Sequence, residues 1–304
     1  MSEAAFAGAC YGYRVRSHTP LRFTRDGGGD TLDVEPYLVP PNRAEQGRPL
    51  LEWSPPAFPF AARLQERGDQ YDLWIGGAGW FGIDPHRRRI RIPESPDVVR
   101  REERLWGLPV LLCFLERGDI PLHAAAVEIG GAAVLLAAPG RFGKTTLAAA
   151  FAAAGHRVLT EDLACVRLED GRASVVPGPA VLRLRHDVAD RLPIPGSVVV
   201  ASDDDRLHVT FDERGTCRPV PLRAVVLLRG EADEPTLRPV PPEQTLADLW
   251  SLSFHLPTGR DRGRCFAGLV DLASTVPLWN LRRRLQIAAL NGTVEAIIAG
   301  CLDG

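Results

Sequence analysis

One short stretch of the sequence carries residues that could bind phosphate. Residues 137–147 read AAPGRFGKTTL, which meets the P-loop pattern G-x-x-x-x-G-K-[ST] at Gly143, Lys144 and Thr145, with Ala138 at the first glycine position. In such a loop, backbone N–H groups and the start of the next helix bind phosphates, the lysine reaches the β- and γ-phosphates, and the threonine hydroxyl is a ligand of Mg²⁺. The predicted nucleotide-binding residues are Gly140, Arg141, Phe142, Gly143, Lys144, Thr145 and Thr146, with Thr145 also a predicted metal ligand.

Lys144 is the only lysine in the chain, and the other 35 of the 36 basic residues are arginine. The abundance of alanine, arginine, glycine and proline indicates a GC-rich coding genome, in which lysine tends to be replaced by arginine wherever either residue will serve. A compact ammonium fits between the β- and γ-phosphates, whereas a planar guanidinium does not fit that position. Chance alone would put the single lysine here about one time in 36, so we interpret the motif as a nucleotide site.

The segments around the motif have the order that a phosphate-binding loop requires. Residues 123–129 and 132–138 read as two short strands, joined by a hairpin turn at Gly130 and Gly131. The loop follows, then a helix over residues 143–155 that ends at Gly155, and then a strand over residues 156–162. Strand, loop, helix and strand therefore follow one another, which supports the motif beyond its pattern match.

Three further side chains are predicted to lie beside the loop. If the hairpin turns at Gly130, cross-strand partners sum to about 260, so that His123 lies opposite Ala137 at the mouth of the loop. A right-handed crossover would run the strand after the helix parallel to residues 132–138. Glu161 and Asp162, at the end of that strand, would then lie at the same edge as the phosphates. We expect the histidine and the two carboxylates to converge on the γ-phosphate.

The rest of the chain divides near residue 95. Residues 1–95 read as a β-rich N-terminal domain, with paired strands in YDLWIGG and GWFGID and a proline-laden loop over residues 40–59. Residues 96–304 form the predicted second domain, which begins with one helix capped within residues 95–97. We also expect a core strand over residues 223–230 and helices over residues 242–254 and 281–299.

The composition limits the classes of function. The 304 residues carry a net charge of −2, so no nucleic-acid partner is implied, and the longest apolar run is too short to cross a membrane. The first residues have no basic segment followed by an apolar core, so we expect no secretion signal. The six cysteines are scattered without CxxC pairs, which favours reduced, mostly buried thiols in a cytoplasmic protein. A homo-oligomer stays open.

Residues 120–170 resemble the HPr kinase/phosphorylase family in the order and spacing of the histidine, the loop and the carboxylate pair. The stretches YGYRVRSHTPL and STVPLWNLRRRLQIAALNGTVEAI resemble one branch, the HPr-kinase-like serine kinases encoded with peptide-modifying enzymes, including lasso-peptide precursor kinases. The resemblance implies an α/β fold in which a P-loop kinase domain, with a core shared with phosphoenolpyruvate carboxykinases, follows a β-rich N-terminal domain.

The resemblance also implies an activity and residue roles. The activity is transfer of the ATP γ-phosphate to a hydroxyl, on a serine of a small ribosomal peptide or on a small metabolite. His123 is then a catalytic histidine, and the Asp-Asp pair of the family falls on Glu161 and Asp162. We assign the base to Asp162, which keeps the residue type of the family, and the Mg²⁺ ligand to Glu161; the reverse assignment stays open. The loop departs from the family at Ala138 and Arg141, where the family has glycines.

Two other classes of function are alternatives to a kinase. A non-catalytic nucleotide- or peptide-binding subunit of a peptide-modifying system stays open, and consumption of Mg-ATP with the co-encoded peptide would separate it from a kinase. A mechanical or ABC-type ATPase is disfavoured, because the core strand ends in Arg229 and Gly230 rather than in an aspartate, and there is no ABC signature. The sequence does not identify the phosphate acceptor.

Overall fold

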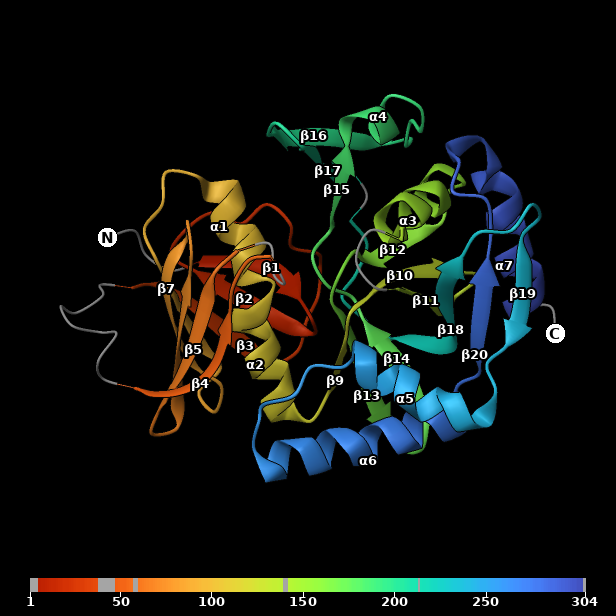
Figure 1. The fold of residues 1–304 in the computed structure, drawn as a ribbon. Coiled ribbons are helices and arrows are strands. Elements are labelled where there is room, and N and C mark those ends of the chain that lie inside the picture. Colours follow the sequence, from red (N-terminus) through yellow and green to blue (C-terminus); the bar gives the residue numbers. More distant parts are fainter. Residues whose placement is uncertain (1–4, 38–46, 57–59, 139–141, 213, 303–304) are drawn as a thin grey trace.

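A computed structural model describes residues 5–37, 47–56, 60–138, 142–212 and 214–302. The chain has a mixed α/β fold, rich in strands, with three β-sheets (Figure 1). The eight-stranded sheet is formed by the N-terminal part of the chain, and the nine-stranded sheet carries the phosphate-loop segment. A small sheet of three strands lies above the nine-stranded sheet in Figure 1. No helix in these ranges is long and apolar enough to cross a membrane.

The N-terminal sheet has the order β1-β2-β3-β8-β7-β6-β5-β4. Its predicted pair around the glycines is confirmed, because β6 pairs antiparallel with β7. The prediction of a loop over residues 40–59 is wrong in part: β4 lies within it and pairs with β5. Pro49 is tolerated there because β4 is an edge strand, where one strand side needs no ladder hydrogen bond. The strands are β1 (Ala5–Cys10), β2 (Tyr13–Ser17), β3 (Thr31–Pro36), β4 (Arg48–Trp53), β5 (Ala62–Arg67), β6 (Gln70–Ile75), β7 (Gly79–Asp84) and β8 (Arg89–Ile92).

Two helices, α1 (Val98–Leu105) and α2 (Leu108–Arg117), stand where one was predicted. The cap within residues 95–97 is confirmed, since the Asp97 side chain accepts from the Arg100 backbone N–H at 2.9 Å. The chain breaks at Trp106 and Gly107 because Pro109 has no N–H and its ring would clash with the carbonyl four residues earlier.

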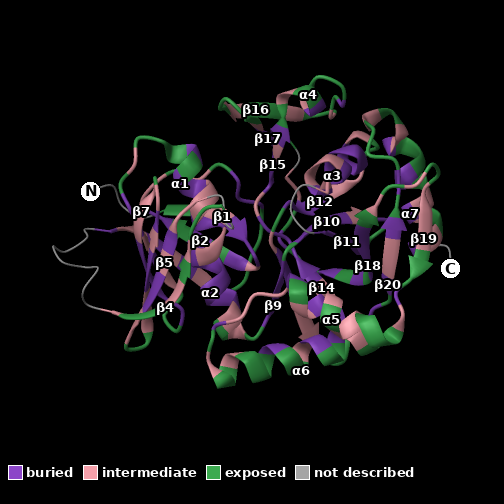
Figure 2. Cartoon of the chain, viewed as in Figure 1, coloured by how far each residue is buried: buried purple, intermediate pink, exposed green. Residues whose placement is uncertain are grey.

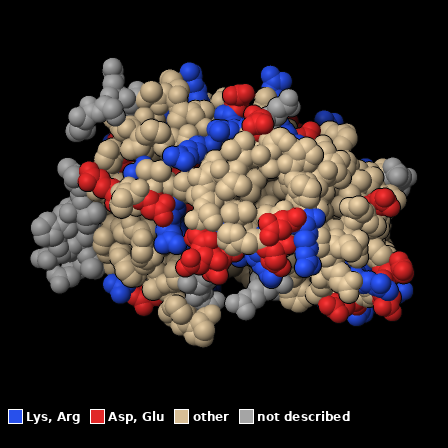
Figure 3. Space-filling model, turned by 90° about the horizontal axis from the view of Figure 1, so that it is seen from above, with Lys and Arg blue, Asp and Glu red and all other residues tan. Residues whose placement is uncertain are grey.

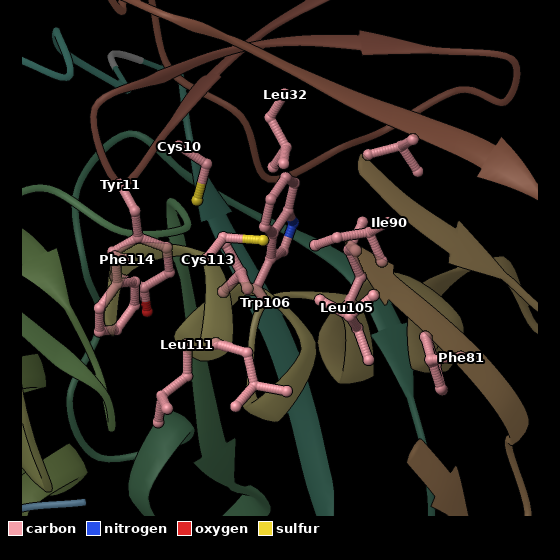
Figure 4. Packing of buried hydrophobic residues seen from close by; sticks show 14 of the residues in the cluster. Cys10, Tyr11, Leu32, Phe81, Ile90, Leu105, Trp106, Leu111, Cys113 and Phe114 are labelled. Carbon is pink, nitrogen blue, oxygen red and sulfur yellow. The ribbon is translucent and has the colours of Figure 1, made fainter. Parts of the chain in front are cut away.

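Both helices pack on the eight-stranded sheet. Leu105 and Trp106 of the α1 end and Leu111 of α2 belong to the same hydrophobic cluster as Leu32 and Ile90 of the sheet (Figure 4). This cluster also extends to Val176, Val181 and Leu256, which lie far along the chain. The predicted boundary at residue 95 stays a prediction.

The nine-stranded sheet has the order β12-β10-β11-β18-β14-β13-β9, with β20 beside β18 and β19 beside β20. Helices α3 and α7 contribute to one hydrophobic cluster of this sheet, and α5 and α6 contribute to the other (Figure 2). Its strands are β9 (Ile120–Leu122), β10 (Ala124–Ile129), β11 (Ala132–Ala137), β12 (Arg157–Thr160), β13 (Ala164–Glu169), β14 (Arg172–Val176), β18 (Val220–Gly230), β19 (Thr236–Pro239) and β20 (Leu278–Arg282). The helices are α3 (Lys144–Ala153), α5 (Pro242–Leu252), α6 (Gly259–Thr275) and α7 (Leu290–Leu302), with a short 3-10 turn over Ile287–Ala289.

The hairpin and the crossover around the loop differ in detail from the prediction. In the β10–β11 hairpin Ala124 pairs with Ala137, so the register is one residue away from the one that we expected, because both Gly130 and Gly131 lie in the turn. Strand β12 runs in the predicted direction, but β10 lies between it and β11 and pairs antiparallel with both. Strand β18 pairs parallel with both β11 and β20, so all three strands run in the same direction.

The third sheet has the order β15-β17-β16, with the strands β15 (Val181–Arg185), β17 (Arg206–Phe211) and β16 (Ser197–Ser202), and the short helix α4 (His186–Ala189). The helix predicted over residues 281–299 is wrong at its start, because β20 first pairs parallel with β18 and helical structure begins at Ile287. All six cysteines are buried.

Candidate active site

The predicted site residues meet at one edge of the nine-stranded sheet. Strand β11 ends at Ala137 before the loop, helix α3 begins at Lys144 after it, and β12 ends at Thr160. His123 immediately precedes β10, so it lies at the edge where the antiparallel strand β11 ends. The predicted nucleotide-binding residues Gly140 and Arg141 lie outside the described residues. Phe142 packs at the border of a hydrophobic cluster, and Thr146 is the third residue of α3.

Lys144 connects the loop ends with the histidine. Its Nζ donates to the Ala138 carbonyl oxygen at 2.9 Å and lies 2.8 Å from His123 Nε2. The residue is only 7% exposed. Burial lowers the pKa of the Lys144 ammonium, although the nearby carboxylates of Asp162 and Glu161 act in the opposite direction. A buried ammonium at the start of α3 is suited to bind a polyphosphate.

His123 lies between the lysine and Asp162. An ammonium can only donate, so the Nε2 atom that faces Lys144 accepts and the ring hydrogen is on Nδ1. Nδ1 lies 3.5 Å from Asp162 Oδ1. Burial lowers the pKa of His123 below its ordinary value; the Asp162 carboxylate acts in the opposite direction, but the charge of Lys144 adds to the lowering, and the net effect favours the neutral ring. The backbone N–H of His123 donates to the Leu252 carbonyl at 2.8 Å, so the end of α5 helps to fix its position.

Glu161 lies beside the threonine of the loop. The Thr145 hydroxyl donates to Glu161 Oε1 at 2.9 Å, and the Glu161 residue is only 5% exposed. Both are hard oxygen ligands, and Mg²⁺ bound with a nucleotide is usually held by one or two carboxylates, phosphates and water. The pair therefore fits a Mg²⁺ site. Among the described residues, no group of three or more His, Cys, Asp or Glu side chains could hold a metal ion.

Asp162 has a different environment from its neighbour, since half of its side chain is exposed. Burial of the carboxyl would raise its pKa, but the charges of Arg183 and Lys144 and the hydrogen bond from Arg183 outweigh that effect and lower it. Asp162 is thus an ionised carboxylate that solvent, and an acceptor group, can reach. Its exposure lets an external hydroxyl come within hydrogen-bond reach, which is the geometric requirement for a general base.

Arg183 contacts both carboxylates, although the sequence alone does not predict it as a site residue. Its Nε and backbone N–H both donate to Glu161 Oε2, at 2.8 and 3.1 Å, and its Nη2 lies 3.5 Å from Asp162 Oδ2. Its Nη1 donates to Glu103 Oε1 of α1 at 2.7 Å. The alternating pattern of β15 indicates a strand but does not separate Arg183 from the other 34 arginines, because its partners lie far away in the sequence.

Glu103 and His208 form the layer behind Arg183. His208 Nε2 lies 3.2 Å from Glu103 Oε2, and the Glu103 side chain is 17% exposed. Burial would raise the pKa of Glu103, but the hydrogen bond to His208 and the charge of Arg183 prevail and lower it to about 2.

Seen from above, basic and acidic side chains are intermixed on the surface of the described residues (Figure 3).

Comparisons with known proteins give a distant similarity among solved structures alone. No protein-family model matches the chain, and no curated protein matches it. Among solved structures, an Hpr(Ser) kinase/phosphatase from Coxiella burnetii is similar, with a TM-score of 0.34 and 12% sequence identity. That similarity covers 60% of this chain and 99% of the other chain. It is a distant structural resemblance.

Proposed function

We propose that the chain is an ATP-dependent kinase that transfers the γ-phosphate to a hydroxyl group. The acceptor is a serine of a small ribosomal peptide or a small hydroxylated metabolite. One observation carries the proposal: Lys144, His123 and Asp162, from three separate segments, form a continuous chain of contacts at the start of α3. A buried cation next to an exposed, ionised carboxylate suits transfer of phosphate to an incoming group better than storage of a nucleotide.

Each residue contributes a separate step. The Lys144 ammonium binds the β- and γ-phosphates, and the N-terminal N–H groups of α3 add to the binding. Asp162 accepts the proton of the acceptor hydroxyl as its oxygen forms a bond to the γ-phosphorus and the bond to the bridging oxygen of ADP breaks. Neutral His123 contacts both Lys144 and Asp162 and so fixes the positions of the two side chains relative to each other.

Glu161 and Thr145 would hold Mg²⁺, which neutralises charge on the phosphates. Arg183 fixes the orientation of Glu161 through two hydrogen bonds to one oxygen, which leaves the other oxygen towards Thr145. The Glu161 oxygen that faces Thr145 is therefore held ready for a ligand, and the side chain has little freedom to turn away.

The test is consumption of Mg-ATP in the presence of the peptide encoded beside the gene, or of a panel of hydroxylated metabolites. A kinase releases ADP in proportion to acceptor, and Asp162→Asn removes that release while it still binds ATP. Asp170→Asn is the matched control, because Asp170 lies in the distant β13–β14 turn at a positive φ that asparagine also adopts. Binding of ATP by the wild-type protein without any acceptor-dependent ADP would favour the non-catalytic subunit instead.

A further inference from the structure

Arg283 lies at the same edge of the sheet as the phosphate loop. It directly follows β20, which runs parallel to β18, and β18 runs parallel to β11. The carboxyl ends of the three strands therefore meet at one edge, where open α/β sheets bind their ligands. The backbone N–H of Arg283 donates to the Gly230 carbonyl at 3.1 Å, which fixes it at the end of β18.

The guanidinium of Arg283 is packed against the loop. Nη2 donates to the Phe142 carbonyl oxygen at 3.5 Å, and Nη1 donates to the Arg284 carbonyl oxygen at 2.9 Å. A Cβ atom added to Gly143 would lie only 2.8 Å from Nη2, so a side chain there would meet the guanidinium. Gly143 also has φ +79°, which favours glycine. The glycine that precedes Lys144 thus leaves room for a second cation.

Arg283 is buried without a counter-ion. The residue is 4% exposed, whereas its neighbours Arg282 and Arg284 are exposed. Within the part of the chain that the structure describes, no carboxylate lies within ion-pair distance of Arg283, and its Nε has no hydrogen-bond partner. Burial alone lowers its pKa. An arginine stays charged in proteins, so a buried positive charge here is unfavourable until an anion arrives.

Arg25 and the partly buried Arg183 lack this deficit. The buried Arg101 also has an Nε without a hydrogen-bond partner, but it lies in α1, whereas Arg283 lies against the phosphate loop. Arg183 has three carboxylate partners. Arg25 has no carboxylate in its hydrogen bonds, but its Nε, Nη1 and Nη2 all donate to backbone carbonyls. A structural role accounts for both of these arginines. It does not account for Arg283, whose Nε lacks a partner and whose charge is not neutralised.

We propose that Arg283 is a phosphate-binding residue of the nucleotide site, the second cation that neutralises the polyphosphate together with Lys144. The inference rests on the proposed function, since it needs a nucleoside polyphosphate at the loop. A guanidinium is suited to phosphate because it presents several donors in one plane. Lys144, at the start of α3, and Arg283, just after β20, then bind the phosphates from two separate segments of the chain.

The three consecutive arginines provide a matched experiment. We would prepare Arg283→Met, with Arg282→Met and Arg284→Met as controls that remove the same charge from exposed positions. The readouts are the dissociation constants for ATP, ADP and AMP and the melting temperature of the protein without nucleotide. Because a charge-assisted hydrogen bond is lost, Arg283→Met should weaken ATP and ADP binding at least about tenfold and AMP binding much less. The controls should stay within about twofold, since exposed charges contribute little.

The melting temperature separates binding from a structural role. Removal of a buried, uncompensated charge should offset the loss of the two hydrogen bonds to the Phe142 and Arg284 carbonyl oxygens, so the melting temperature without nucleotide should stay unchanged or rise, whereas loss of a structural arginine would lower it. Unchanged ATP affinity in Arg283→Met, or equal losses for ATP and AMP, would overturn the inference. Arg283→Lys keeps the charge and should retain more ATP affinity than the Met variant; if the Met variant does not fold, wild-type affinity in Arg283→Gln overturns the inference. If wild-type protein binds no ATP, the proposed function fails and the inference fails with it.

Discussion

At the scale of single residues, the shape of one head group matters more than its charge. Lys144 Nζ is within hydrogen-bond distance of both Ala138 O and His123 Nε2, in a buried position. A planar guanidinium at the end of a longer side chain cannot make both contacts from the same helix position. The chain uses arginine at every other basic position, including the partly buried Arg183 and the buried Arg283. The head group therefore distinguishes this site from the others.

Lys144→Arg should lower Mg-ATP affinity or turnover by at least about 100-fold while the fold is retained, because charge is kept and only head-group shape changes. Isothermal titration with Mg-ATP and a circular dichroism spectrum of the same sample measure the two quantities. Arg284→Lys, at an exposed position, is the control for arginine–lysine exchange. ATP binding at the wild-type level in Lys144→Arg contradicts the role that we give to the ammonium.

Substitutions of Asp162 and Glu161 should affect different measured quantities. Asp162→Asn should reduce turnover about 100-fold or more with little change in ATP affinity, because it removes the proton acceptor but no phosphate contact. Glu161→Gln should raise the Mg²⁺ concentration needed for half-maximal turnover, because it removes a charged oxygen beside Thr145. Steady-state rates across a Mg²⁺ series distinguish them. The opposite pattern reverses the two roles, and two silent variants mean that both carboxylates are structural.

At the scale of elements, the helix and strands next to the loop could be predicted from local sequence patterns, whereas strands that depend on long-range pairing could not. The β10–β11 hairpin and helix α3 follow from a glycine turn and an alanine-rich run within 32 residues of chain (124–155), and both are confirmed apart from one residue of register. Strand β4 was missed because Pro49 and the prolines that flank the strand indicate a loop, whereas its pairing with β5 is a contact that no local pattern encodes. Strand β20 was missed because its partner β18 lies about 50 residues earlier.

The same limit applies to the site. His123, Glu161 and Asp162 could be placed from strand directions, because each lies at the end of a short local element. Their predicted positions beside Lys144 and Thr145 agree with the contacts in the structure. Their catalytic roles stay a prediction. Arg183, Glu103 and Arg283 could not be placed, because each depends on contacts between segments that are 80 or more residues apart in the chain or on burial that no local pattern encodes.

The contact between α1 and β15 should make stability depend on pH. The pKa of Glu103 is lowered from 4.5 to about 2 in the folded chain. Its stabilising contribution is therefore complete above about pH 4.5 and is lost as the pH falls towards 2, with an upper limit of about 3 kcal/mol. Glu103→Gln removes the titration. Urea unfolding at several pH values between 6 and 3 should show the difference between wild type and variant shrinking as the pH falls.

The control for this prediction is Glu169→Gln, on a carboxylate that is 71% exposed in its ion pair with Arg167. Its stability difference from wild type should be small at every pH, because exposed ion pairs contribute about 1 kcal/mol or less. A pH-independent difference between wild type and Glu103→Gln would contradict the assignment of a strongly ionised Glu103.

At the scale of the whole molecule, the N-terminal sheet supports the segment that carries the carboxylates. Arg25, from the loop after β2, donates to the backbone carbonyls of Val158 and Leu159 in β12, at 2.8 and 3.1 Å. The Tyr11 hydroxyl donates to the Leu163 carbonyl at 3.0 Å. These contacts hold the chain on both sides of Glu161 and Asp162. The N-terminal part is thus in direct contact with the segment that forms the candidate site.

Arg25→Met should therefore destabilise the whole chain, in contrast to Arg283→Met. The substitution leaves several buried carbonyl oxygens without their donors, and each such loss costs about 1 kcal/mol or more. We expect the free energy of unfolding to fall by at least about 2 kcal/mol, measured by urea denaturation. Equal stability of Arg25→Met and wild type would mean that the N-terminal sheet does not hold β12 through this arginine.

The most direct test of the kinase proposal follows the γ-phosphate itself. Protein would be incubated with Mg²⁺ and ATP labelled at the γ-phosphate, together with the peptide encoded beside its gene and a panel of hydroxylated metabolites, and each acceptor would be examined by mass spectrometry. We predict one labelled phosphate on an acceptor hydroxyl with wild-type protein and with Asp170→Asn, and none with Lys144→Arg or Asp162→Asn. Label that stays on ATP, or that appears only as inorganic phosphate, while ATP still binds, would contradict the kinase and leave a nucleotide-binding subunit.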